Sequence, residues 1–243
     1  MENNFDNYLK RFNLDDNNIR LKYDHSCRVM HLTSKYARNL GFSDYDVKLA
    51  SLIGLLHDIG RFEQLKTYDS FYDKETIDHA DLGVKILFED GLIKKFWDNK
   101  KDYELIEFAI KNHNKKNISK CNNKDYIKQA KLIRDVDKID IMYIYGVTDE
   151  LKIRGIHDKI SDEVLKNIRQ HKIISYEMTK NDNDKIALSF AFAFDINYDE
   201  CLGEFKKYLN KFYDKLTYKE EFDEILNIIN EYIDERMNSY VRN

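Results

Sequence analysis

Proline is absent from the 243 residues of this chain, and glycine occurs only eight times. Proline removes a helical hydrogen bond and glycine costs backbone entropy, so their scarcity favours long helices over turns and linkers. Apolar residues also recur at the three- and four-residue spacing of amphipathic helices along most of the chain. The sequence therefore predicts an all-α fold, and a chain of this length can bury a large apolar core.

Capping residues and glycines mark the limits of several expected helices. Asp15 to Asn18 offers caps for a helix that runs to about Leu40, and Ser43 begins a helix that is apolar on nearly all sides. Gly60 is expected to end that second helix in the left-handed conformation, and Gly83 to let a neighbouring helix approach closely. Further helices are expected over residues 4–13, 78–89, 102–112, 125–143, 162–172, 186–196, 204–216 and 219–236.

Charges of both signs are spread along the chain, with 40 lysines and arginines against 44 acidic residues. This balance argues against a surface that coats nucleic acid. The acidic N-terminus lacks an apolar signal core, and no stretch approaches the roughly 18–20 apolar residues of a membrane span. The three cysteines are far apart, which predicts free thiols in a reducing compartment. We expect a soluble cytoplasmic protein with no membrane partner.

A histidine–aspartate pair, His57-Asp58, stands at the end of the most apolar predicted helix. There it would lie at the negative end of the helix dipole, in a core of low dielectric constant. An isolated buried carboxylate is very costly in such a place, so Asp58 needs a cationic partner or a metal ion. A metal ion explains why two side chains of the ligand type end an apolar helix.

Three further histidines and one aspartate lie on or at the end of apolar stripes in other predicted helices: His25, His79, His113 and Asp137. With the pair above they make six imidazole and carboxylate ligands from five helices, which is enough for two divalent ions. Two metals roughly 3.5–4 Å apart can clamp a phosphate and lower the pKa of a bound water from ~15.7 to ~7. Asp58 is the candidate bridge, because a carboxylate has two oxygens to share.

The order of these residues resembles the HD-domain superfamily of metal-dependent phosphohydrolases, named for its His-Asp doublet. The segment HSCRV from His25 is similar to the family's first-histidine helix, and LHDIGR from Leu56 is similar to its signature. The segment RDVDKID from Arg134 is similar to its closing helix, in which Asp137 matches the ligand. The segment HADLG from His79, together with His113, resembles two-metal branches such as the HD-GYP and diadenosine-polyphosphate-cleaving types. The resemblance covers about residues 20–145.

The match to HD-GYP proteins is incomplete. Those proteins carry a lysine where this chain has Arg61 and a double histidine where it has His113-Asn114, and the GYP tripeptide is absent. The resemblance therefore does not imply cleavage of cyclic di-GMP. It implies a two-metal type without the GYP motif, which holds one or two divalent ions from among Mn, Fe, Mg, Zn, Co and Ni.

The resemblance implies a hydrolase that cleaves phosphate ester or anhydride bonds with a metal-activated water. The family suggests a nucleotide or dinucleotide as the small phosphorylated substrate. Two alternatives stay open at this point: a di-iron HD-domain oxygenase with the same ligands, and a non-catalytic sensor that binds nucleotides. Oxygen uptake by an iron-loaded protein would indicate the first, and nucleotide binding without turnover the second.

Asp58 and Arg61 are the expected catalytic residues. Arg61 can either hold a substrate phosphate by bidentate hydrogen bonds or form a salt bridge to a ligand carboxylate. Arg28, one turn after His25, and Lys138, beside the aspartate of the closing helix, are further candidates for binding phosphate. Several other ionisable residues are expected to be solvated at the surface: His31, His157, His171, Asp135 and Asp140.

We expect an HD-domain helical bundle with additional C-terminal helices. Residues 1–146 are predicted to form the metal-dependent phosphohydrolase core, and residues 147–243 a helical extension packed on that core. The extension carries no cluster of ligand-type residues, so it is expected to cover the site or to form a dimer contact. A second copy of the chain is therefore an expected partner, besides the phosphorylated substrate.

Overall fold

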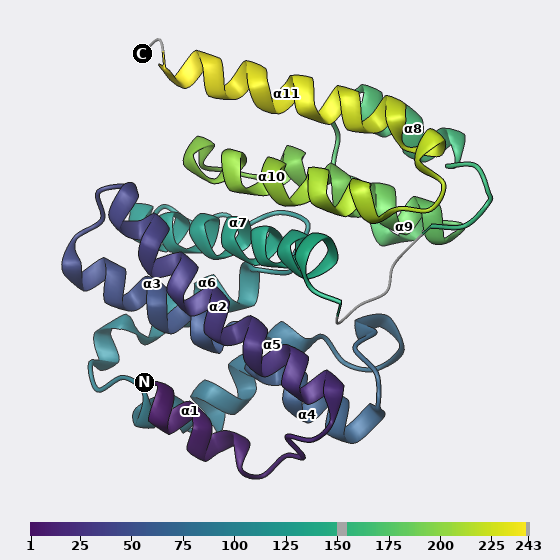
Figure 1. The fold of residues 1–243 in the computed structure, drawn as a ribbon. Coiled ribbons are helices and arrows are strands. Elements are labelled where there is room, and N and C mark those ends of the chain that lie inside the picture. Colours follow the sequence, from purple (N-terminus) through teal and green to yellow (C-terminus); the bar gives the residue numbers. More distant parts are fainter. Residues whose placement is uncertain (150–154, 242–243) are drawn as a thin grey trace. The chain divides into compact units, whose positions relative to one another are not determined.

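The computed structural model describes residues 1–149 and 155–241. Within those ranges the regular elements are all helices and no strand occurs, which confirms the all-α prediction (Figure 1). The chain divides into two compact units, Met1–Val136 and Asp137–Asn243. The predicted domain boundary after residue 146 stays a prediction, and residues 150–154 and 242–243 of the predicted extension lie outside the described residues.

Apart from α4, which was not among the expected helices, the helices of the first unit lie close to the predicted ranges. They are α1 (Glu2–Leu9), α2 (Asn17–Asn39), α3 (Asp44–Leu56), α4 (Ile59–Tyr68), α5 (His79–Val84), α6 (Tyr103–Asn112) and the first part of α7 (Lys124–Val147). A π-helical segment extends α5 over Lys85–Glu89. Short 3₁₀ helices occupy Asp73–Glu75, Leu92–Lys95 and Lys100–Asp102.

Close contact between α2 and α3 positions the first two histidines of the predicted site, and Figure 1 shows these helices side by side. A Cβ atom built on Gly54 of α3 would lie 2.5 Å from Thr33 Oγ1 and 2.9 Å from the Val29 carbonyl oxygen of α2. Only glycine lets the two backbones approach this closely. Both helices begin at predicted side-chain caps, Asp16 for α2 and Ser43 for α3.

Gly60 does not end a helix, so that prediction is wrong. Helix α3 stops at Leu56 and α4 begins at Ile59, which places Gly60 in the first turn of α4 without a positive φ. Its lack of a side chain serves a close approach instead. A Cβ on Gly60 would lie 2.1 Å from the His79 carbonyl oxygen and 2.7 Å from the Gly83 nitrogen of α5. The predicted close approach of another helix at Gly83 is thereby confirmed.

The second unit contains the rest of α7, followed by α8 (Asp162–Arg169), α9 (Asp182–Phe190), α10 (Asp199–Lys215) and α11 (Asp223–Val241). Short 3₁₀ helices occupy Tyr176–Met178, Ala191–Asp195 and Lys219–Glu221. The apolar run at 186–196 is helical, as predicted, because α9 continues directly into a 3₁₀ helix. Within this unit the Phe190 ring packs against Phe212 and Phe222, with ring centroids 5.6 and 5.8 Å apart.

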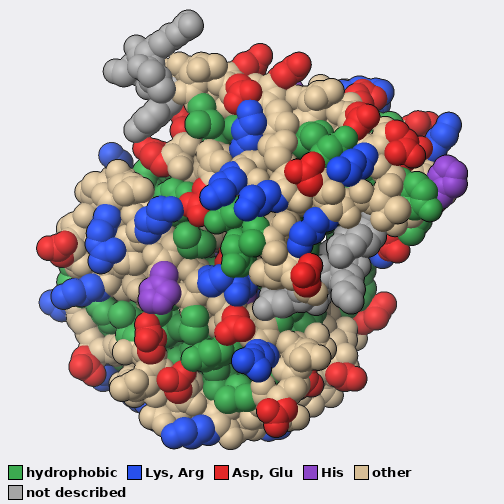
Figure 2. Space-filling model, in the orientation of Figure 1, with side chains coloured by type: hydrophobic (Ala, Val, Ile, Leu, Met, Phe, Trp, Pro, Cys, Tyr) green, Lys and Arg blue, Asp and Glu red, His purple; other side chains and the backbone are tan. Residues whose placement is uncertain are grey.

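Charged side chains of both signs are interspersed over the face that Figure 2 shows. This distribution agrees with the net charge of −4. The three cysteines, Cys27, Cys121 and Cys201, are free thiols. In the part of the chain that the structure describes, no helix is both long and apolar enough to cross a membrane.

Candidate metal centre

Asp58 lies at the junction between α3 and α4, where its carboxylate is buried. His57 directly follows the last residue of α3, and Asp58 precedes the first turn of α4. The pair thus ends the apolar helix, as predicted. Because Asp58 also stands at the positive end of the α4 dipole, that second helix favours the charge of the carboxylate.

Four imidazoles from four different helices surround the Asp58 carboxylate. On one side, Nε2 of His25 and Nε2 of His57 lie 3.5 and 3.7 Å from Asp58 Oδ2. On the other side, Nε2 of His79 and Nε2 of His113 lie 3.2 and 3.6 Å from Asp58 Oδ1. All five side chains are buried. The fold therefore brings five of the six predicted ligands to one centre and assigns two imidazoles to each carboxylate oxygen.

Hydrogen bonds at Nδ1 fix which ring nitrogen carries the hydrogen in three of these imidazoles. His57 and His113 each donate from Nδ1 to the carbonyl oxygen three residues earlier, at 2.8 and 2.6 Å. His79 donates from Nδ1 to Asp73 Oδ2 at 2.6 Å. Because carbonyl and carboxylate oxygens only accept, Nδ1 carries a hydrogen in each ring, and in the neutral form of the ring Nε2 then presents a lone pair. Burial also lowers the pKa of His113 to about 4, so this ring is neutral at pH 7.

The Nε2 atoms of the four imidazoles approach one another in two pairs. The Nε2 atoms of His25 and His57 are 3.2 Å apart, and those of His79 and His113 are 3.0 Å apart. Two acceptors at such distances repel each other unless a proton or a metal ion lies between them. Each group together with Asp58 also places its three ligand atoms within 4.8 Å of one another. Nitrogen and oxygen donors of this kind suit divalent transition metals, so the residues fit one ion on each side of Asp58.

Lys22, which sequence reasoning missed, supplies positive charge next to the carboxylate. It lies one helical turn before His25 in α2, and its Nζ is 2.6 Å from Asp58 Oδ2. Burial alone would raise the pKa of Asp58, but the Lys22 ammonium and the imidazoles outweigh it and hold that pKa well below its usual range. The spacing of a lysine three residues before a core histidine is the signal that could have identified Lys22.

Asp73 is a second missed residue, and it holds two side chains of the site in place. One of its oxygens accepts the hydrogen bond from His79, and the other accepts from Arg61 Nη1 at 2.7 Å and Gln64 Nε2 at 2.9 Å. Burial would raise the pKa of Asp73, but these bonds and the Arg61 charge outweigh it and lower the pKa. A carboxylate behind a ligating histidine fixes the ring orientation. Asp73 lies in a short 3₁₀ helix among other charged residues, and no sequence pattern marks it.

Arg61 forms the salt bridge to a ligand carboxylate that was one of its two predicted roles. Its Nε lies 3.7 Å from Asp58 Oδ1, and its Nη1 donates to Asp73 and to the Phe71 carbonyl oxygen. The buried Nε itself has no hydrogen-bond partner. One N–H of this guanidinium is therefore available to a bound phosphate oxygen, so the second predicted role stays open.

Asp73, Asp78 and His79 form another group of close ligand-type atoms, but their hydrogen bonds are already used. Asp78 caps α5 and accepts from Lys115 Nζ at 2.7 Å and from Asn114 Nδ2 at 3.2 Å. Although burial opposes it, the Lys115 hydrogen bond contributes most to lowering the pKa of Asp78 to about 2. This group is an ion-pair network that supports His79 rather than a further metal site.

The other predicted site residues lie on α2 and α7. Arg28 is half-buried on α2. Asp137 is half-buried on α7 and is the first residue of the second unit. Lys138 Nζ lies 2.9 Å from Asp195 Oδ2 in an ion pair of the second unit. Metal ligation by Asp137 and phosphate binding by Arg28 and Lys138 stay predictions.

Asp135 and Asp140 are buried, so the expectation that they are solvated is wrong. Both lie within α7, which runs on to Val147, well beyond the predicted end of that helix. They therefore do not lie near a frayed helix end. The three histidines that were expected at the surface are exposed, as predicted: His31, His157 and His171.

The comparisons with known proteins agree with this geometry. Residues 23–142 match the model of one protein family, the HD domain. The match begins two residues before His25 and ends five residues after Asp137, so it spans all six predicted ligands. Comparison with curated proteins and with solved structures gave no match. Proteins that carry this domain are generally metal-dependent hydrolases. Through residues 23–142, the chain belongs to the HD-domain superfamily.

Proposed function

We propose that this protein is a metal-dependent phosphohydrolase that cleaves a phosphate ester or anhydride bond. The observation that carries the proposal is the division of the Asp58 carboxylate between two pairs of imidazoles, His25 with His57 and His79 with His113. This arrangement suits two divalent ions that share Asp58. Such ion pairs bind both the attacking and the leaving oxygen of a phosphoryl group.

When bound, the ions would supply an activated water at neutral pH and neutralise charge that develops at phosphorus. The side chains of the centre and those around it have different roles. Asp58 and the four imidazoles hold the centre, and Asp73 keeps the hydrogen of His79 on Nδ1 so that Nε2 faces Asp58. Arg61 offers its unused Nε–H to a phosphate oxygen of the substrate. We also propose that Asp137 completes the ligand set.

We propose a nucleotide or dinucleotide as the substrate, which is the class that the HD-domain resemblance implies. The cations beside the centre support an anionic substrate. Lys22 and Arg61 both lie within 4 Å of the Asp58 carboxylate, and the side chains of both remain partly exposed. These two groups can therefore attract and hold phosphate groups that a neutral site would bind weakly.

Phosphate release from a panel of nucleotides and dinucleotides, with the purified protein loaded with Mn²⁺, tests the proposal. Asp58→Ala should abolish metal uptake and phosphate release together, because both imidazole pairs lose their shared oxygen ligand. Asp98→Ala is the matched control, since Asp98 is an exposed acid outside the site. It should keep the metal content and the rate of the unchanged protein.

Three results would contradict the proposal. Full metal occupancy and full phosphate release in Asp58→Ala would show that the centre is not where the reaction occurs. Oxygen uptake by the iron-loaded protein, without phosphate release in air-free buffer, would favour the oxygenase alternative. Nucleotide binding without turnover in the presence of each candidate metal would favour the sensor.

A further inference from the structure

The second unit contains a cavity of about 640 Å³. None of its described lining residues belongs to the candidate metal centre. Its described lining comes from α7, α9, α10 and the segments around Ile156, Tyr176 and Phe192. Cavities that hold small molecules usually have volumes of about 300–1,000 Å³ and mainly apolar walls with a few polar groups. This cavity has both properties.

One stripe of α7 connects the cavity to a predicted metal ligand. Ile141 and Tyr145 line the cavity, and they follow Asp137 by four and eight residues on the same helix. Residues at this spacing share a helix face, and the rise of about 1.5 Å per residue places them about 6 and 12 Å along the axis from Asp137. All three are half-buried, whereas Ile139 and Met142 between them are buried. Part of the surface of each of these three side chains therefore remains accessible.

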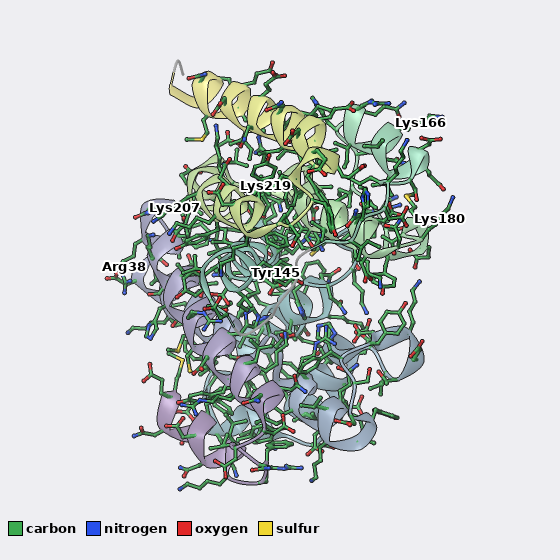
Figure 3. All side chains as sticks on the ribbon, turned by 45° about the vertical axis from the view of Figure 1, so that its right-hand side comes forward. Arg38, Tyr145, Lys166, Lys180, Lys207 and Lys219 are labelled. Atoms are coloured by element: carbon green, nitrogen blue, oxygen red, sulfur yellow. The ribbon has the colours of Figure 1, made fainter. Side chains whose placement is uncertain are left out.

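Four aromatic side chains line this cavity beside aliphatic ones. Tyr145, Tyr176, Phe192 and Phe212 line it, and the rings of Tyr145 and Phe212 contact each other with centroids 5.0 Å apart. Figure 3 labels Tyr145 near the middle of the view, whereas Lys166 and Lys180 lie at its right-hand edge. Aromatic walls of this kind offer stacking surfaces for a planar ring.

A few polar groups accompany the aromatic walls. Ser189 is buried, and its hydroxyl donates to the Lys185 carbonyl oxygen at 3.1 Å, so its oxygen can still accept. Lys185 and Asp182 form an exposed ion pair with Nζ 2.9 Å from Oδ1. These side chains offer donors and acceptors to one edge of a bound molecule. A heterocycle has two flat faces for the aromatic walls and a polar edge for these groups.

We propose that this cavity binds the base of a nucleotide substrate. The inference rests on the proposed function, because it places the base at one end of the α7 stripe and the phosphate near Asp137 at the other. A nucleoside phosphate has this order of parts, with the ribose between the base and the phosphate. The chemistry of the cavity thus supports the nucleotide class proposed above and gives the stacking heterocycle a binding site of its own.

Direct binding of nucleosides tests the cavity independently of hydrolysis, because nucleosides carry no phosphate. Adenosine, guanosine, cytidine and uridine are titrated by calorimetry into the full-length protein. At least one should bind, and Tyr145→Ala should weaken that binding by about fivefold or more through loss of a stacking surface. Ile141→Trp, which fills the cavity from the same helix face, should also weaken nucleoside binding. A loss of binding in both variants argues against misfolding of Tyr145→Ala as its cause.

Tyr143→Ala provides the matched control for the loss of a tyrosine from α7. Tyr143 packs against Tyr208, with ring centroids 5.3 Å apart, and is not among the described lining of the cavity. This variant should bind the nucleoside with the affinity of the unchanged protein. If no nucleoside binds, or if Tyr145→Ala and Ile141→Trp both bind as well as Tyr143→Ala, the proposal is wrong.

Hydrolysis assays separate failure of this inference from failure of the proposed function. The bound nucleoside should inhibit hydrolysis of its own 5′-phosphate competitively, and ribose 5-phosphate should show a lower kcat/KM than that nucleotide. Equal rates for both phosphates, or noncompetitive inhibition, would overturn the base assignment while the phosphohydrolase remains. Nucleoside binding that depends on Tyr145, without hydrolysis of any phosphate, would support the cavity and overturn the phosphohydrolase.

Discussion

Replacing Asp73 with asparagine tests whether the centre holds two ions in separate places. In the native chain one Asp73 oxygen accepts from His79, while the other accepts from Arg61 and Gln64. Asparagine keeps the size but exchanges one oxygen for an NH₂ group. In either orientation this group faces a donor, so His79 or its neighbours must lose a hydrogen bond.

The expected loss of metal affinity in Asp73→Asn depends on which histidine Asp73 holds by a hydrogen bond, and that histidine is His79. Loss of a carboxylate behind a ligating histidine costs about 10- to 100-fold in metal affinity, or ~1.4–2.7 kcal/mol. Only the ion between His79 and His113 should weaken, because the Nε2 atoms of His25 and His57 converge on the other Asp58 oxygen. Calorimetric titration with Mn²⁺ should therefore show one site of unchanged affinity and one weakened site.

Asp98→Asn is the control for this experiment, because it makes the same exchange at an exposed position outside the centre. It should bind two ions as the unchanged protein does. The reasoning would be refuted if Asp73→Asn also bound two ions with unchanged affinities. Equal weakening of both ions would instead show that the imidazoles act as one undivided site.

Three further perturbations follow from the same geometry. Lys22→Gln should tighten Mn²⁺ binding several-fold in a metal titration, because the ammonium no longer shares the Asp58 oxygen; weaker binding would contradict this. Gly60→Ala should lower the free energy of unfolding in urea by ~1–3 kcal/mol, because its Cβ would meet a backbone oxygen of α5 at 2.1 Å. Gly203→Ala, whose Cβ meets only a methionine methyl at 3.6 Å, should show no such loss. The metal-free protein should lose stability as the pH falls from about 6.5 toward 4, by up to ~3 kcal/mol, since the unfolded His113 imidazole takes up a proton before the folded one does. A pH dependence of the urea midpoint that is unchanged in His113→Gln would rule out this assignment.

Most helices of the first unit, and the convergence of the predicted ligands within it, could be predicted from the sequence because an apolar stripe on a helix must face the core. An imidazole on an apolar stripe must face the core, and the stripes of His25, His79 and His113 all lead there. The adjacent His57-Asp58 pair follows from the same rule, since it ends an apolar helix. Local spacing along a helix was therefore enough to identify residues that lie far apart in the chain.

Residues whose roles depend on contacts between distant elements could not be predicted in this way. Gly60 looked like a helix stop because glycine is common there, but its role is set by the α5 backbone, which sequence spacing does not reveal. Asp73 resembles the acids around it until the fold places it against His79. The aromatic cavity was also missed, because its walls come from several segments of the second unit.

If two ions share the Asp58 carboxylate, as proposed, this has a consequence for how the protein acquires them. One negative charge serves both sides, so the first ion to arrive neutralises the charge that would have attracted the second. The two binding events are then coupled, and the second proceeds with lower affinity. The level of free metal in the surroundings would set the fraction of fully loaded protein, and this dependence would regulate activity without a separate effector site.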